Sequence, residues 1–166
     1  MIVSNATPLI YLAKIERLEL LKKAFKEVAI SEEVKKEVVD EGKRLHKSDA
    51  LLVEKAIEAG WIKVKKASSL AEIQWDIEKG EKSVIALAKE TGTREVLIDE
   101  ASARTAAKLS GLIPRGTVFV LLKALKMKEI TFDEFLNCLE ELVKKGFRLS
   151  EEIYIKAVEE ARKISS

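Results

Sequence analysis

The feature that most constrains the fold is the alternation of short strand-like runs with helical stretches. Strand-like runs occur at Ile2 to Ser4, in "EVAI" ending at Ile30, in "WIKVK" from Trp61 and in "REVLID" from Arg94. Segments with helical patterns separate and follow these runs. Such βαβα order is typical of a mainly parallel sheet covered by helices. We therefore predict an α/β fold, a three-layer α/β/α arrangement around a mainly parallel central sheet.

Local signals indicate where the helices begin and end. Thr7 followed by Pro8 fits an N-cap and a first helical position, which predicts a helix that starts directly after Asn5 and runs from Thr7 to about Phe25. The segment "GEKSVIALAKETG" predicts a helix bounded by glycines, and Thr131 with Glu134 predicts a capping box. After "LIPRGT" the chain reads as helices only. We expect one domain over residues 1–166, with residues 128–166 as a C-terminal helical extension packed on it.

Composition excludes several classes of protein. Apolar residues make up 47% and charged residues 35% of the 166 residues, which indicates a folded chain. The formal net charge of +2 does not by itself indicate a nucleic-acid binder, so a basic patch would have to be local. The single Cys138 excludes an intramolecular disulfide and a cysteine-based zinc site, and we expect it in the core.

Two further expectations concern location and the one histidine. No apolar run approaches the roughly 18 residues of a membrane span, and no signal peptide is recognisable at the N-terminus, so we expect a cytoplasmic protein without a membrane partner. His46 lies in the polar stretch "EGKRLHKSD". We expect its side chain to be exposed to solvent.

Four polar residues interrupt apolar patterns. Glu37 falls on or beside the stripe that Val34 and Val38 form, and Glu81 heads the stripe of the following helix, so both are expected to point inward. Asn5 and Asp99 each end an apolar strand-like run. The carboxyl ends of parallel strands form the edge of the sheet at which ligands bind.

Together these residues predict a divalent metal site. Carboxylates buried without partners are costly, so several inward acids indicate a cation or paired basic groups. Oxygen ligands without His or Cys suit Mg²⁺ or Mn²⁺. Each residue alone also has an ordinary explanation. Glu37 and Glu81 could be helix-surface or dipole-complementing acids, Asp99 a helix N-cap, and Asn5 a turn residue.

Four segments in order resemble the signatures of PIN-domain nucleases: "IVSNATPLIYLAKI", "SEEVKKEVV", "GEKSVIALA" and "LIDEASARTAAKLSGLIPRGT". The resemblance covers about Met1 to Lys126 and is closest to a prokaryotic branch related to the toxins of toxin–antitoxin pairs. It implies the PIN-like α/β/α fold and metal-dependent cleavage of single-stranded RNA by an acidic cluster that binds Mg²⁺ or Mn²⁺. It also implies a homodimer and a small antitoxin protein as partners.

The resemblance assigns catalytic and metal-binding roles by position. The four family acids fall on Asn5, Glu37, Glu81 and Asp99, and the adjacent Glu100 is a supplementary ligand or a first-turn helix acid. Asn5 departs from the family because a neutral carboxamide replaces a charged ligand. Its amide oxygen can still coordinate Mg²⁺, although weaker metal binding is expected.

Two arginines are candidates for contacts with the substrate, and two alternative functions fit the same sequence. Arg104 and Arg115 are candidates for binding substrate phosphate, and both could equally be surface ion-pair residues. One alternative is a catalytically impaired module of the same fold that binds RNA or protein. Another is a phosphoacceptor domain that uses Asp99, which the sequence disfavours because the first strand ends without an acidic pair.

Overall fold

The computed structural model describes all 166 residues and contains one five-stranded sheet in which every neighbouring pair is parallel. The strand order is β3-β2-β1-β4-β5, which confirms the predicted parallel sheet. The strands are β1 (Ile2–Ser4), β2 (Val28–Ser31), β3 (Ile62–Lys65), β4 (Glu95–Leu97) and β5 (Ile113–Arg115).

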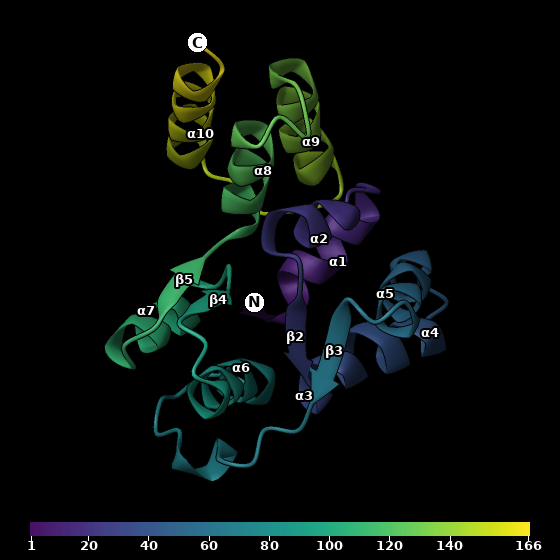
Figure 1. Ribbon diagram of the computed structural model, residues 1–166, viewed down its shortest axis with the longest axis vertical. Coiled ribbons are helices and arrows are strands. Elements are labelled where there is room, and N and C mark those ends of the chain that lie inside the picture. The colour runs from purple at the N-terminus through teal and green to yellow at the C-terminus, as the bar shows by residue number, and fades with distance from the viewer.

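Helices flank the sheet and form the C-terminal part of the chain (Figure 1). The first group runs from β1 to β3: α1 (Ala6–Lys14), α2 (Glu19–Phe25), α3 (Glu32–Lys35), the π-helical turn η1 (Lys36–Asp40), α4 (Glu41–Arg44) and α5 (Ser48–Glu58). The second group comprises the 3-10 turn η2 (Leu70–Glu72), α6 (Lys79–Thr91), α7 (Ala101–Leu109), α8 (Thr117–Lys126), α9 (Phe132–Lys144) and α10 (Glu151–Ser165).

Burial along the strands follows their place in the sheet. All residues of β1 and β2 are buried, as expected for strands covered on both faces. The edge strand β3 buries Ile62 but exposes Lys63 and Val64. The other edge strand, β5, was not predicted, because three residues that include Pro114 carry little strand signal. A proline is tolerated there because an edge strand has backbone groups without a partner.

Two helix predictions were wrong in detail. The helix predicted from Thr7 to Phe25 is interrupted between α1 and α2, where Glu16 adopts a positive φ of 59°. Helix α1 begins at Ala6, directly after Asn5 as predicted, but its N-cap residue is Asn5 and not Thr7, so Thr7 lies inside the first turn. The side chain of Thr7 is therefore free to contact another part of the chain.

The C-terminal helices belong to the same core as the sheet. Helix α10 packs on α8 and α9, and the apolar stripe of α9 buries Phe135, Leu139 and Leu142 in the continuous core. Cys138 is buried, and Thr131 and Glu134 form the expected capping box.

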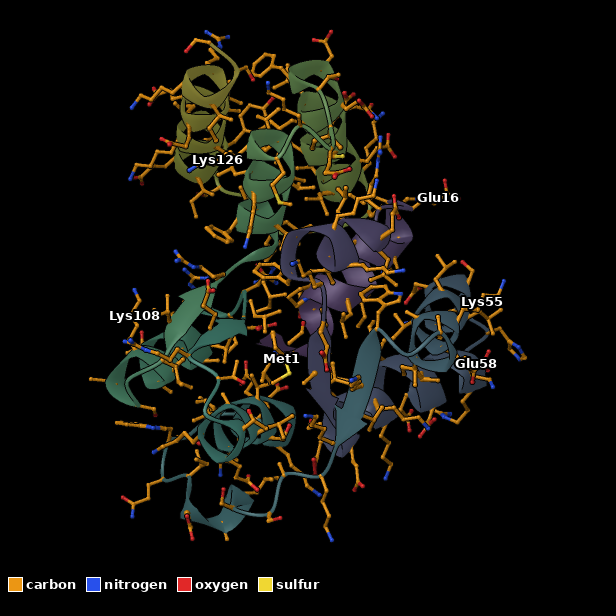
Figure 2. The ribbon with its side chains drawn as sticks, in the orientation of Figure 1. Met1, Glu16, Lys55, Glu58, Lys108 and Lys126 are labelled. Atoms are coloured by element: carbon orange, nitrogen blue, oxygen red, sulfur yellow. The ribbon has the colours of Figure 1, made fainter.

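Charged side chains such as Lys55, Glu58 and Lys108 project outward (Figure 2). None of the helices is long and apolar enough to cross a membrane.

The strand order creates a switch point beside the central strand. From β1 the chain moves to β2 and β3 on one side, and it then crosses back to β4 on the other side of β1. At such a point the connections leave in opposite directions, and ligands bind outside the carboxyl ends of the strands. Asn5 follows β1 and Glu100 lies three residues after the end of β4, so both lie at this switch point.

Candidate metal centre

The polar group at the end of β1 is the side chain of Asn5, which is only 5% exposed. Its backbone N–H donates to the carbonyl of Leu97 at 2.9 Å, which ties it to the end of β4. Its side-chain nitrogen Nδ2 lies 3.3 Å from Glu100 Oε2 and donates to it. The oxygen Oδ1 therefore faces away from Glu100 and is available to another ligand.

Glu100 lies at the N-terminus of α7, and its carboxylate contacts α1. Besides the bond from Asn5, Glu100 Oε1 accepts a hydrogen bond of 2.6 Å from Thr7 Oγ1. The sequence assigned Glu100 only a supplementary or first-turn role. The structure instead brings it directly to Asn5, and Thr7 is a contact that the sequence did not predict.

Glu37 lies in the π-helical turn η1 and is exposed, whereas the sequence predicted an inward side chain. Val34 and Val38 are buried on either side of it in the sequence, and Glu37 Oε1 lies 3.9 Å from the position of a Cβ atom on Gly80. Its carboxylate faces the acids of α6 and α7. Desolvation, followed by repulsion from Glu78, Glu100 and Glu81, raises the pKa of Glu37 above its usual value.

Glu81 lies in the first turn of α6 and is buried, as predicted, with 6% exposure. Its Oε1 accepts a hydrogen bond of 3.0 Å from the backbone N–H of Glu78. Burial raises the pKa of Glu81, the bond from Glu78 opposes this, and the carboxylates of Glu100 and Glu78 raise it further. Glu78 is an acid near this site that the sequence analysis missed, although its spacing of three residues from Glu81 is that of a capping box.

Two buried serines connect the helices that carry Glu37 and Glu81. Ser31 Oγ and Ser83 Oγ are hydrogen-bonded at 2.6 Å, and Ser31 Oγ also accepts from the backbone N–H of Val34 at 3.0 Å. These bonds fix the start of α3 against the first turn of α6. They therefore position Glu37 relative to Glu81.

Gly80 leaves an opening between Asn5 and Glu37. A Cβ atom placed on Gly80 would lie 3.8 Å from Asn5 Oδ1 and 3.9 Å from Glu37 Oε1, and these are the two atoms outside its chain neighbours and its own helix backbone that it would approach. Two oxygen ligands thus face the same point from different elements. We call Asn5, Glu37, Glu81 and Glu100 the Asn5 cluster.

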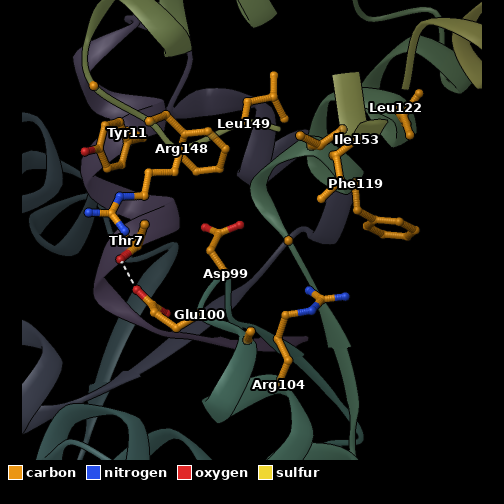
Figure 3. Close-up of a pocket in the computed structure, with 15 residues that line it drawn as sticks. Thr7, Tyr11, Asp99, Glu100, Arg104, Phe119, Leu122, Arg148, Leu149 and Ile153 are labelled. Atoms are coloured by element: carbon orange, nitrogen blue, oxygen red, sulfur yellow. Dashed lines mark hydrogen bonds between the residues drawn. The ribbon is translucent and has the colours of Figure 1, made fainter. Parts of the chain in front are cut away.

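Asp99 makes its side-chain hydrogen bonds to the start of α8 and not to the residues of the Asn5 cluster. Its Oδ1 accepts from the backbone N–H of Thr117 at 2.8 Å, and its Oδ2 accepts from Thr117 Oγ1 at 2.7 Å. Figure 3 shows Asp99 and Glu100 turned apart, with Glu100 directed at Thr7. Burial raises the pKa of Asp99 despite these bonds from Thr117. The carboxylate of Asp99 therefore holds the N-terminus of α8.

The two predicted phosphate-binding arginines have internal partners. Arg104 Nη1 donates to the carbonyl of Ile98 at 2.9 Å, and Arg115 Nε lies 3.1 Å from Glu95 Oε2. The Arg115 guanidinium also covers the ring of Phe119 at 4.3 Å from its centroid. His46 is exposed, as expected, and lies on another part of the chain.

The donor set of the Asn5 cluster fits a hard divalent cation. It combines the carboxylates of Glu37, Glu81 and Glu100 with the free amide oxygen of Asn5, and oxygen donors of this kind suit Mg²⁺ or Mn²⁺. No three carboxylates are close enough, as the side chains stand, to share one ion.

Comparison with known proteins identifies a family. The family model DUF3368, described as a PIN domain, matches residues 1–163. No curated protein and no solved structure gives a significant match.

Proposed function

Because the chain belongs to the PIN-domain family, whose members are typically nucleases, we propose that it is a metal-dependent ribonuclease that hydrolyses phosphodiester bonds of single-stranded RNA. The observation that carries this proposal is the convergence of Asn5 Oδ1 and Glu37 Oε1 on the opening at Gly80. Both lie at the switch point of the sheet, next to Glu81 and Glu100.

Each residue of the Asn5 cluster has a distinct role in the proposal. Glu37, Glu81 and Glu100 would hold Mg²⁺ or Mn²⁺, and Asn5 would add its amide oxygen. Such an ion, when bound, supplies a Lewis acid and an activated water molecule to phosphodiester hydrolysis. Thr7 and Asn5 orient the carboxylate of Glu100 through their hydrogen bonds. Asp99, assigned by the family pattern as a ligand, acts in this proposal as a positioning residue for α8.

The finer parts of the proposal rest on the resemblance of the sequence segments. We propose RNA rather than DNA as the substrate, cytoplasmic location, a homodimer, and a role as the toxin of a toxin–antitoxin pair with a small antitoxin partner. The support for these is the order of the four family-like segments between Met1 and Lys126.

A second candidate function is a catalytically impaired module that binds RNA or protein. Two observations favour it: Asn5 is neutral where the family has an acid, and no three carboxylates are gathered closely enough to share an ion. A nuclease and an RNA-binding module both predict RNA binding, whereas a protein-binding module does not, and only the nuclease predicts metal-dependent turnover.

Cleavage of a fluorescent single-stranded RNA with Mn²⁺ tests the choice between them. Wild type, Glu81→Gln and Lys79→Gln are compared, because Lys79 is an exposed charge in the same turn of α6. Cleavage by wild type and Lys79→Gln, with loss of about a hundredfold or more in Glu81→Gln, supports the nuclease. If wild type is inactive and Asn5→Asp cleaves, the impaired module is the correct function.

A further inference from the structure

A pocket of about 810 Å³ lies between the sheet edge and the C-terminal helices, next to the Asn5 cluster (Figure 3). We call it the Arg148 pocket. Thr7 and Glu100 line it, so it is continuous with the Asn5 cluster through residues that hold Glu100 in place. Its volume falls in the range of roughly 300–1,000 Å³ that small-molecule sites occupy.

One wall of the Arg148 pocket is apolar. It is formed by Phe119 and Leu122 of α8, Leu149, and Ile153 of α10. Phe147 is held at the same wall by Tyr11, with ring centroids 5.2 Å apart and an edge-on angle of 74°. Ile153 is 52% exposed although it is a large apolar side chain. The wall therefore presents apolar surface to whatever enters the pocket.

The pocket also holds two guanidinium groups. Arg148 is exposed and has no hydrogen bond and no ion pair with any other residue. Arg104 uses Nη1 to hold the carbonyl of Ile98 and retains further N–H donors. Figure 3 shows these two arginines on opposite sides of Asp99. Arg148 is thus the cation of this pocket that lacks a partner in the protein.

We propose that the Arg148 pocket binds one unpaired nucleotide of the RNA strand, adjacent to the phosphate placed at the Asn5 cluster. The base lies against the apolar wall, and Arg148 with Arg104 binds the nucleotide's phosphate. Only an unpaired nucleotide can leave the base stack and place a face of its base against such a wall. This inference rests on the proposed function, because it names the substrate contacts of the same site.

Charge explains why a cation is needed here. The carboxylates of the Asn5 cluster repel a phosphodiester backbone, and this repulsion is greatest before a metal binds. A guanidinium presents several donors in a plane and binds phosphate in a bidentate manner. Arg148, near Glu100 but paired with no carboxylate, offsets the repulsion at the entrance to the cluster.

Fluorescence anisotropy of a labelled single-stranded oligoribonucleotide tests the pocket without turnover. Binding is measured in EDTA and again with Ca²⁺, at several salt concentrations. Arg148→Gln is compared with Arg162→Gln, an exposed arginine of α10 outside the pocket, and Ile153→Gln with Ile155→Gln, since Ile155 is similarly exposed outside it. Neither control changes a residue of the Asn5 cluster.

We expect Arg148→Gln to weaken binding about tenfold and to reduce the slope of log K against log salt by about 0.7, as loss of one phosphate contact on a single strand does. Ile153→Gln should weaken binding by about fivefold without changing the slope. Arg162→Gln and Ile155→Gln should match wild type within about twofold.

The outcomes separate this inference from the proposed function. Equal affinities and slopes for Arg148→Gln and Arg162→Gln overturn the nucleotide pocket, even if the protein cleaves RNA. No binding by wild type in either EDTA or Ca²⁺ overturns the pocket and the RNA substrate together. Binding that depends on Arg148 in a protein that never cleaves with Mn²⁺ supports the pocket and rejects only the nuclease.

Discussion

Asn5 Nδ2 lies 3.3 Å from Glu100 Oε2 and donates to it, which turns the other end of the carboxamide toward Glu37 and the Gly80 opening. An aspartate at this position would face Glu100 with a second carboxylate and would add repulsion to a cluster in which the pKa values of Glu37 and Glu81 are already raised. The carboxamide therefore relieves charge in the metal-free protein while it keeps one oxygen for a cation.

Asn5→Asp is expected to have opposite effects with and without metal. Without metal, the lost hydrogen bond and the added repulsion lower the free energy of unfolding by about 1–3 kcal/mol. With Mn²⁺, the extra negative ligand raises metal affinity by about tenfold or more. Isothermal titration calorimetry and thermal unfolding measure both effects, and Asn137→Asp, at an exposed position of α9, is the control. A change of the same sign in both measurements would contradict this account of Asn5.

Divalent metal should stabilise the fold through the Asn5 cluster. At about one hundred times the Kd, a ligand that binds only the folded state adds about 2.7 kcal/mol, which raises the Tm of a domain of this size by several degrees. Glu81→Gln should abolish most of this rise because it removes one charged ligand. Differential scanning fluorimetry with Mn²⁺ is the measurement. A rise that Glu81→Gln leaves intact would place the metal elsewhere.

The raised pKa values of Glu37 and Glu81 give the metal-free protein a defined pH dependence. The folded state binds these protons more tightly than the unfolded state, so their contribution favours folding at acidic pH and is lost as pH rises through the raised pKa values. Glu81→Gln should therefore be more stable than wild type at pH 7–8, and the difference should shrink toward pH 4. Chemical denaturation across this pH range tests the sign.

Glu100 and Asp99 are adjacent but should respond differently to charge removal. Glu100→Gln is expected to weaken Mn²⁺ binding about tenfold or more with little loss of stability, because the residue belongs to the Asn5 cluster. Asp99→Asn should mainly lower stability, by about 1–3 kcal/mol, because it loses the charged acceptor that binds Thr117 at the start of α8. Titration calorimetry and denaturant unfolding of both variants distinguish the roles. Strong loss of metal binding in Asp99→Asn, with stability unchanged, would restore Asp99 as a ligand.

Gly80→Ala should separate folding from metal binding. Gly80 lies in α6 with ordinary backbone geometry, so alanine is expected to stabilise the helix by up to about 1 kcal/mol. The new methyl group would occupy the space between Asn5 Oδ1 and Glu37 Oε1 and weaken Mn²⁺ binding several-fold. The same calorimetric titration, with Lys79→Ala as the control in the same turn, tests this. Unchanged Mn²⁺ affinity would show that the opening at Gly80 does not receive the ion.

Much of the fold could be predicted because strong local patterns produce it. The buried runs of β1 and β2 and the glycine-bounded α6 were all predicted, since their periodicity and end signals are local. The short edge strand β5 was missed because its pairing with β4 comes from the neighbouring strand and not from its own residues. The break between α1 and α2 was missed because Glu16 adopts a positive φ without the glycine that usually signals it.

The candidate site was less predictable, because the directions of individual side chains decide which residues come together there. Glu81 was correctly expected to be buried. Glu37 was also expected to point inward, but it is exposed and lies in the π-helical turn η1, which the sequence did not indicate. Thr7 was interpreted as a cap, although its hydroxyl binds Glu100. Contacts between residues more than ninety positions apart leave no local pattern in a single sequence.

By itself the sequence determined the alternating elements, the parallel sheet and the placing of polar groups after β1 and β4, because these follow from local periodicity and from the crossovers that parallel strands require. Only the tertiary structure decided which of two consecutive acids faces Asn5. Asp99 and Glu100 follow the same strand, β4. Thr117 binds the carboxylate of Asp99 at the start of α8, whereas Thr7 binds the carboxylate of Glu100 at the start of α1. That choice depends on the packing of α1 and α8 around the sheet, which no local pattern encodes.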